Sequence, residues 1–287
     1  MFDLIVSSIP LALVASTPLL LAVEGELVVQ RSGIINLGIE GMMLVAAMTA
    51  VLGAQLTGSV AAGFLGGIAG AALIALLFGL FAIVLRADQI VTGTAINLLA
   101  LGVTSFVYRA MQQGAIFVQS VPQLRRDVVL PIAWMIVPPL LALLVWNTSF
   151  GLRLRACGEN PEAVAGAGWS VARHRAAALG IEALLAGLAG AYLSLGLSSG
   201  FAENMTAGRG FIALSIVIFG RWKLKGALLG TALFGLTAAL QYALQASSRG
   251  VPYHLLLALP YVVTLLILCG IAGRVRSPEA LGRQSRV

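Results

Sequence analysis

The chain has 287 residues, of which 59% are hydrophobic and only 10% charged, and its mean hydropathy is +0.98. A soluble globular domain carries roughly 25% charged residues, so this composition excludes a water-soluble surface and predicts a polytopic membrane protein. The net charge of +7 would favour a nucleic-acid partner in a soluble protein. Here no basic run is interleaved with aromatic residues, and cytoplasmic loops rich in Arg and Lys account for the charge. We therefore expect no nucleic-acid partner; the medium around the protein is membrane lipid.

Apolar segments follow one another along almost the whole chain. A helix needs about 20 apolar residues to cross the hydrocarbon core of a bilayer. The predicted segments lie near residues 4–22, 41–56, 60–85, 90–108, 131–147, 176–198, 207–220, 226–245 and 254–272. We expect a single transmembrane domain over residues 1–287: an all-α membrane protein of about eight transmembrane helices plus short broken or re-entrant segments.

Two of these segments, 41–56 and 207–220, are short and are preceded by glycines and polar residues. Short, glycine-interrupted segments in corresponding positions of two halves are typical of the broken helices of transporters. Each is followed by two further segments, and the two triplets run in opposite senses across the membrane, which predicts an inverted repeat of two halves. The alternative is two ordinary spans with loosely drawn ends.

Positive charges set the expected orientation. The central loop 148–175 and the tail 273–287 each carry four arginines, and such loops face the cytoplasm. With both placed inside, Arg31, Arg86 and Arg221 also fall inside and the amino terminus falls outside.

Several kinds of chemistry have no residues to carry them. The sequence lacks a G-x-x-x-x-G-K-[ST] phosphate loop, a G-x-S-x-G nucleophile motif and any His/Cys/carboxylate cluster with metal-ligand spacing. We therefore expect no catalytic residues, no metal and no cofactor, and the chain cannot hydrolyse ATP through a phosphate loop of its own.

The segment 149–175 is long for a helix connection and polar. Asn160 is a good N-cap and Pro161 suits the first position of a helix, while Glu162 favours the positive end of that helix. Small residues follow from Ala163. The segment is either a solvated loop with an incidental helix or a docking helix for a cytoplasmic partner.

Three stretches together resemble a known family. RSGIINLGIEGMML (31–44), the loop 149–175 and FAENMTAGRGFIALSIVIFGRW (201–222) are similar to the permease subunits of bacterial ABC importers, in the branch handling nucleosides and simple sugars. The resemblance covers roughly residues 18–272. Leu224 stands where such permeases usually have a proline, which affects the turn that follows Trp222.

The resemblance implies a multi-pass protein of the bacterial inner membrane that is not itself an enzyme. It implies cytoplasmic ATP-binding subunits, a second and usually paralogous permease, and an extracytoplasmic solute-binding protein. Segment 149–175 would then be a cytoplasmic coupling loop and 273–287 a cytoplasmic tail. The residues that would couple to the ATPase are Gly158, Glu159, Asn160, Pro161, Glu162, Ala163 and Gly166.

The resemblance also bears on the solute. A nucleoside or related small polar solute is expected; a simple sugar or branched-chain amino acid is the alternative within the family. An ion-gradient-driven secondary transporter is the alternative from another class, because it would explain an inverted repeat and carboxylates in the membrane.

Polar residues inside apolar segments need partners, water or a functional reason. The candidates for lining a translocation pathway are Asn36, Glu40, Asn97, Asn204 and Met205. Helix–helix hydrogen bonding is the alternative for the two asparagines Asn36 and Asn97, and a first-turn helix acid is the alternative for Glu40. Three other acids need partners: Arg31 is the candidate for Glu24 or Glu26, and Glu182 is expected to be structural.

Overall fold

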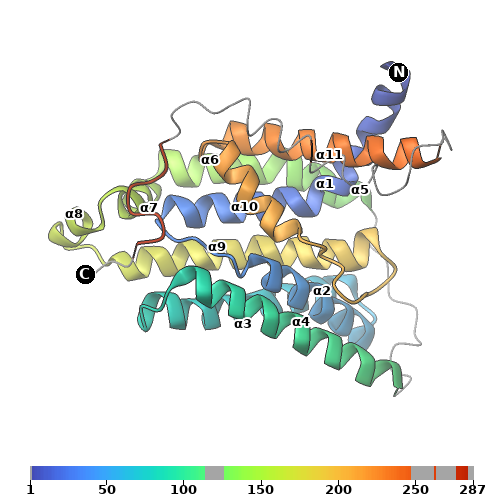
Figure 1. The fold of residues 1–287 in the computed structure, drawn as a ribbon, viewed down its shortest axis with the longest axis horizontal. Helices are drawn as coiled ribbons and strands as arrows, with labels where there is room; N and C mark the ends of the chain where they lie inside the picture. Colours follow the sequence, from blue (N-terminus) through green and yellow to red (C-terminus); the bar gives the residue numbers. More distant parts are fainter. Residues whose placement is uncertain (1, 114–125, 247–261, 263–275, 284–287) are drawn as a thin grey trace.

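In a computed structural model, the chain folds into a bundle of long helices lying side by side (Figure 1). The structure describes residues 2–113, 126–246, 262 and 276–283. Its helices are α1 Phe2–Arg31, α2 Ile39–Thr57, α3 Val60–Gly79, η1 Leu80–Val84, α4 Gln89–Gln113, α5 Arg126–Pro131, η3 Ile132–Ile136, α6 Val137–Asn147, α7 Ser149–Glu159, α8 Pro161–Gly166, α9 Val171–Tyr192, η4 Leu193–Leu197, α10 Arg209–Phe219 and α11 Leu224–Ala246. The three η segments are π-helical turns that continue an α-helix.

Seven helical stretches are long and apolar enough to cross a membrane, and α10 is a shorter apolar helix. The described part of the chain contains no strand, so the predicted all-α multi-pass fold is confirmed. The ninth predicted segment, 254–272, lies outside the described residues apart from residue 262.

Two predicted boundaries are wrong. The first segment does not end at residue 22: α1 continues to Arg31 and carries Glu24 and Glu26, which are completely buried. The prediction ended the segment before these acids because a charged side chain facing lipid is costly. However, α1 is surrounded by protein over most of its length, so its acids face other helices. The segment at 41–56 is also longer than predicted, because α2 has 19 residues.

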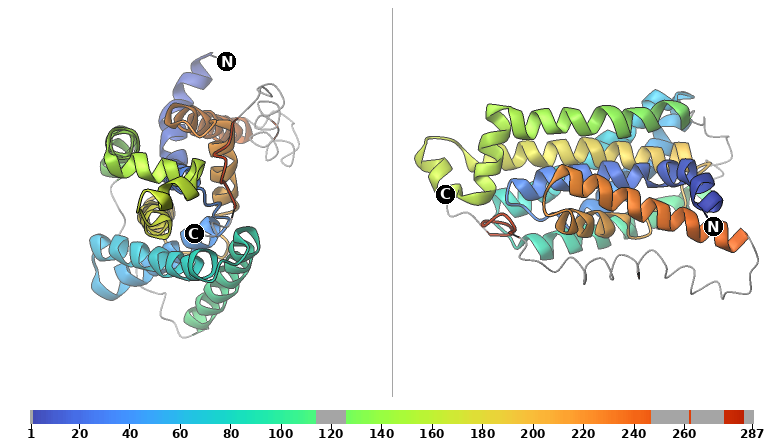
Figure 2. Two further views of the ribbon diagram at one scale, coloured as in Figure 1. Left: turned by 90° about the vertical axis from the view of Figure 1, so that its left-hand side faces the viewer. Right: turned by 90° about the horizontal axis from the view of Figure 1, so that it is seen from above.

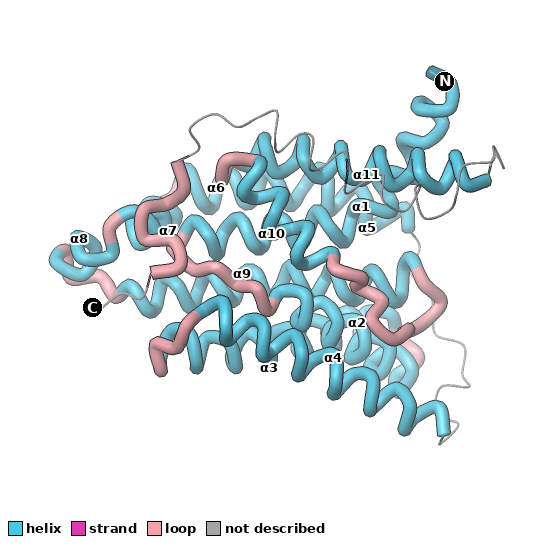
Figure 3. The backbone as a smooth tube through the Cα atoms, viewed as in Figure 1, coloured by secondary structure: helices cyan, strands magenta, loops and turns pink. Residues whose placement is uncertain are grey.

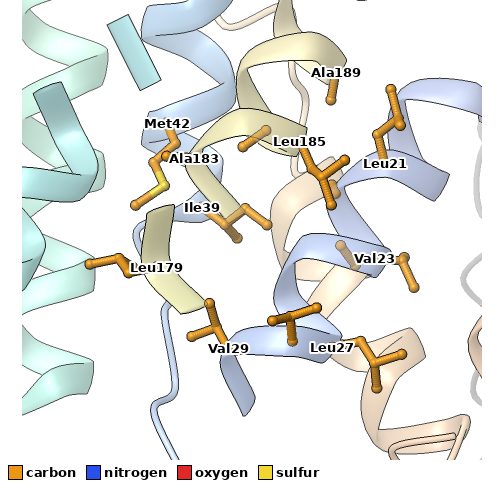
Figure 4. Packing of buried hydrophobic residues seen from close by; sticks show 14 of the residues in the cluster. Leu21, Val23, Leu27, Val29, Ile39, Met42, Leu179, Ala183, Leu185 and Ala189 are labelled. Carbon is orange, nitrogen blue, oxygen red and sulfur yellow. The ribbon is translucent and has the colours of Figure 1, made fainter. Parts of the chain in front are cut away.

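The bundle is built around α1 and α9. Buried side chains of both helices, among them Leu27 and Leu185, belong to one hydrophobic cluster with Ile39 at the start of α2 (Figure 4). Small residues let the backbones approach: a Cβ on Gly67 of α3 would lie 3.1 Å from the carbonyl of Gly187 and 3.2 Å from that of Ala46. The glycine spacing of α3 therefore serves helix packing, as small residues do inside membranes.

The helices α7 and α8 project together from one end of the bundle, beside the described part of the tail (Figures 1 and 2). The amide of Ala280 donates to the carbonyl of Gly158 over 2.8 Å. The central loop and the tail thus lie at the same end of the bundle. Their positive charges predict a cytoplasmic location, and we call this end the cytoplasmic end on that basis.

Candidate functional site: interrupted helices and a cytoplasmic elbow

The bundle is interrupted by two non-helical segments that lead from opposite ends into its interior (Figure 3). Residues 32–38 turn back from the cytoplasmic end of α1 and enter α2, which runs outward. Residues 198–208 turn back from the outer end of η4 and enter α10, which runs inward (Figure 1). This opposed pair has the sense expected of an inverted repeat, with only the second of the two helices short.

Glu40 joins the beginnings of the two interrupted helices. It lies in the first turn of α2, as its position predicts, but its carboxylate accepts hydrogen bonds from the amides of Gly208 (2.8 Å) and Gly210 (2.6 Å) at the start of α10. The exposed amides at a helix N-terminus carry partial positive charge. One buried acid therefore serves the positive ends of both α2 and α10.

Two asparagines hold the segment that enters α2. The Asn36 side chain accepts from the amide of Gly38 (2.9 Å) and donates to Oε2 of Glu182 on α9 (2.7 Å). The half-buried Asn97 on α4 accepts from the amide of Gly41 (2.8 Å) and donates to the carbonyl of Leu37 (2.7 Å).

Both asparagines satisfy backbone groups that the interruption leaves without a helical partner. This is the helix–helix hydrogen bonding considered for them, and it places Asn36, Glu40 and Asn97 around one junction. Glu182 joins the same junction through Asn36.

A line of buried polar side chains continues from this junction along α1. The indole of Trp222 donates to Oε1 of Gln30 (2.6 Å), and the Gln30 amide donates to Oε1 of Glu26 (2.7 Å). Sequence reasoning missed Gln30 and Trp222, because a glutamine and a tryptophan near a span end carry no distinctive spacing.

The predicted pairing of Arg31 with Glu24 or Glu26 is wrong. The Arg31 guanidinium donates to the main-chain carbonyl of Trp222, over 2.8 and 2.5 Å, at the turn between α10 and α11. Arg31 is the last residue of α1, at the cytoplasmic end, so its side chain serves that turn and not the acids farther inside. Within the described residues, both carboxyl oxygens of Glu24 are buried without a hydrogen-bond partner.

Asn204 and Met205 lie apart from this junction, on the outer segment leading into α10. Asn204 is exposed and has a left-handed backbone (φ 54°), while Met205 is half-buried against the cluster that contains Phe201. Beside them Arg109 and Glu203 form an exposed ion pair at 2.9 Å. The Arg109 hydrogen bond holds the pKa of the Glu203 carboxyl below its usual range.

The cytoplasmic elbow, which we define as α7 and α8 (residues 149–166), begins its second helix where the sequence predicts. The side chain of Asn160 accepts from the amide of Ala163 over 3.0 Å, and Pro161 occupies the first helical position. Glu162, Ala163 and Gly166 are exposed, and Val164 is the one buried residue of α8. The helix predicted to begin at Pro161 therefore exists, and most of its surface is exposed.

The first helix of the elbow is fixed firmly to the bundle. Gly158 of α7 lies directly against the carbonyl of Arg31, a contact with no room for a side chain. Cys157 is buried beside it, and this burial raises the pKa of its thiol. The amide of Gly282 in the tail donates to the carbonyl of Gly33 (3.0 Å).

The connection from α8 to α9 is held by side chains. Arg153 of α7 lies over the ring of Trp169 at 3.4 Å, a cation–π contact, and Trp169 packs edge-on against His174 of α9. The elbow is thereby braced from both sides, so a force applied to α8 reaches α1 and α9.

Opposed interrupted helices inside a multi-pass bundle, together with a braced, exposed helix at one end, are the features of a membrane permease. Among the described residues, no three His, Cys, Asp or Glu side chains gather in a way that could hold a metal ion. The chain belongs to the family described as the permease component of the branched-chain amino acid transport system, which it matches over residues 8–270. It is a permease subunit of an ATP-binding cassette importer and a multi-pass protein of the bacterial inner membrane.

Curated relatives cover most of the chain. The guanosine ABC transporter permease protein NupQ of Bacillus subtilis is 34% identical over 88% of both chains. The nucleoside ABC transporter permease protein NupC of Lactococcus lactis is 35% identical, again over 88% of both. The putative glucose ABC transporter permease protein TsgC13 of Haloferax volcanii is 34% identical over 76% of this chain and 71% of its own. No solved structure matches the chain.

Proposed function

We propose that this permease carries a nucleoside into the cytoplasm. The observation that carries the proposal is the similarity to NupQ and NupC, whose names give guanosine and nucleosides as their solutes and which this chain matches over 88% of its length. The similarity to TsgC13 covers less of the chain, so a simple sugar ranks second. A branched-chain amino acid rests on the family description alone. Membership of an ABC permease family disfavours an ion-gradient mechanism.

The work of transport comes, in this proposal, from a separate ATP-binding subunit that seats the elbow. The coupling residues are those of the α7–α8 junction and the exposed face of α8. These are Gly158, Glu159, Asn160, Pro161, Glu162, Ala163 and Gly166. The support is structural: α8 is exposed, is capped by Asn160 and is braced through α7 and Trp169. A rigid helix of this kind transmits the movement of a partner without absorbing it.

The proposed pathway passes the junction of the interrupted helices. Asn204 and Met205 would meet the solute at the outer side, while Asn36, Glu40 and Asn97 would keep the junction open to it farther in. Non-helical backbone at membrane depth is tolerated where it is buried in protein or lines an aqueous cavity. Because α10 is tied to α2 through Glu40, a tilt of α10 would move the start of α2 with it.

Transport itself tests the assignment. The chain would be reconstituted in vesicles with its ATP-binding subunit, its second permease and its solute-binding protein, and uptake of labelled guanosine, glucose and leucine measured with and without ATP. We expect ATP-dependent uptake of guanosine alone. Glucose or leucine uptake in its place would overturn the proposed solute, and uptake by this chain alone would overturn the need for partners.

The elbow is tested separately. Ala163→Trp places a bulky ring on the exposed face of α8, and we expect it to abolish ATP-driven uptake while the thermal stability of the chain stays unchanged. The matched control is Ala61→Trp, the same change at an exposed alanine at the outer end of α3, which should transport normally. Equal uptake by the two variants would contradict the coupling role.

A further inference from the structure

A groove of about 520 Å³ runs along the lateral surface of the bundle between α3, η1 and α9. Every described residue that lines it is apolar. The outer edges are formed by exposed side chains, including Leu76 (73% exposed) and Val84 (68%). Apolar groups this exposed contact lipid tails in a membrane protein, so the groove opens toward the bilayer.

The groove is long enough for a lipid chain. Its lining on α3 and η1 extends from Ile68 to Val84, a rise of about 24 Å at 1.5 Å per residue. One leaflet contributes about half of the roughly 30 Å hydrocarbon core. The groove is therefore longer than the thickness of one leaflet. It can hold the whole acyl chain of a lipid whose headgroup lies at the cytoplasmic surface.

Two arginines lie just beyond the cytoplasmic end of the groove. A Cβ on Gly79 would lie 3.2 Å from Leu179, so the antiparallel helices α3 and α9 are in contact there. Arg86 lies two residues beyond Val84, the last lining residue of η1, and Arg173 lies three residues before Ala176, the first lining residue of α9.

Arg173 also lies on the face of α9 that lines the groove, because Ala176, Gly180 and Leu184 follow it by three, seven and eleven residues. The side chains of both Arg86 and Arg173 are exposed, and within the described residues neither has a hydrogen bond or an ion pair.

Two further charged residues lie near the mouth of the groove, Asp88 and Arg175. The Asp88 carboxylate accepts from the amides of Ile90 and Val91 at the start of α4. The Arg175 guanidinium is buried and donates to the carbonyl of Ser32 over 3.2 Å. The mouth of the groove therefore presents two exposed guanidinium groups at the end of an apolar channel, together with the Asp88 carboxylate held at the start of α4.

We propose that this groove binds one anionic phospholipid of the inner leaflet, with its acyl chain between α3 and α9 and its phosphate between Arg86 and Arg173. The pairing of an apolar channel with two exposed guanidinium groups at its cytoplasmic end matches the two ends of such a lipid. The site lies away from the junction of the interrupted helices and does not depend on the proposed solute.

Native mass spectrometry of the full chain, titrated with phosphatidylglycerol or with phosphatidylcholine, tests the proposal. We expect one phosphatidylglycerol to bind more tightly than phosphatidylcholine. In Arg86→Gln/Arg173→Gln the affinity for phosphatidylglycerol should fall about 25-fold, since each arginine near an anionic surface contributes roughly a factor of five. Affinity for phosphatidylcholine should not change.

Two further variants separate the groove from charge in general. Gly180→Leu fills the channel and should weaken both lipids, while Arg276→Gln/Arg283→Gln removes two exposed arginines of the tail and should weaken neither. Equal binding of the two lipids to the unmodified chain would overturn the proposal, as would unchanged phosphatidylglycerol binding in Arg86→Gln/Arg173→Gln. If the assembled importer retains no phosphatidylglycerol at this site, the groove is a subunit interface and the proposal fails.

Discussion

Replacing Glu40 by alanine tests the link between the two interrupted helices. The substitution removes the acceptor of two hydrogen bonds, from the amides of Gly208 and Gly210, and Glu40 is only 7% exposed. A hydrogen bond to a charged group contributes about 1.5–3 kcal/mol. Gly208 is partly exposed, so its amide can bond to water once the carboxylate is gone. The lower half of that range therefore applies to each of the two bonds, and Glu40→Ala should lower the free energy of unfolding by about 4 kcal/mol.

Thermal unfolding of the purified chain in detergent measures this loss. A change of 1 kcal/mol shifts the midpoint of a large domain by about 2–4 °C, so Glu40→Ala should unfold about 10 °C below the unmodified chain. Glu40→Gln keeps one acceptor oxygen but turns an amide group toward a second donor, and should lie between the two.

The matched control is Glu203→Ala, which also removes a carboxylate with two hydrogen bonds, but from an exposed pair with Arg109. Exposed pairs contribute little, so its midpoint should stay close to that of the unmodified chain. If Glu40→Ala and Glu203→Ala unfold at the same temperature, the reasoning that a buried acid holds α10 against α2 is refuted.

Three further predictions concern single positions. A methyl group on Gly210 would lie 2.6 Å from the amide nitrogen of Glu40. In a denaturant titration, Gly210→Ala should therefore lower the free energy of unfolding by about 3 kcal/mol. The control is Gly102→Ala, where the added methyl group meets open space, and an equally small effect of both substitutions would contradict the close approach at Gly210. Asn160→Ala removes the cap of α8 at a cost of about 1 kcal/mol and should reduce ATP-driven uptake with little change in global unfolding, whereas Asn160→Asp should restore uptake. Because burial raises the pKa of the Cys157 thiol, little thiolate is present at neutral pH. In a Cys269→Ser chain, maleimide labelling of Cys157 should therefore be slow at pH 7, faster at alkaline pH and immediate after denaturation. Rapid labelling of the folded chain at pH 7 would refute the burial of Cys157.

The features that sequence predicted well are local. Asn160 and Pro161 start α8 because an N-cap and a proline act within one turn of helix. The brevity of α10 follows from glycines and polar residues directly before it. In each case the residues that determine the structure are neighbours in the chain.

The features that sequence missed depend on partners far away. Glu40 is bonded to amides 168 and 170 residues later, and nothing near Glu40 in the sequence identifies them. The end of α1 was misplaced for the same reason, since Glu26 is tolerated inside the bundle only because Gln30 and the neighbouring helices surround it. Hydropathy measures the tendency of a segment to face lipid, and α1 faces protein.

The two hydrogen bonds that residues 276–283 make to Gly158 and Gly33 have a consequence for biogenesis. This stretch leaves the ribosome after every described helix. The carbonyl groups of Gly158 and Gly33 therefore lack these two hydrogen bonds until synthesis of the tail is complete. A nascent chain can therefore place its helices in the bilayer well before the cytoplasmic base of the molecule is complete.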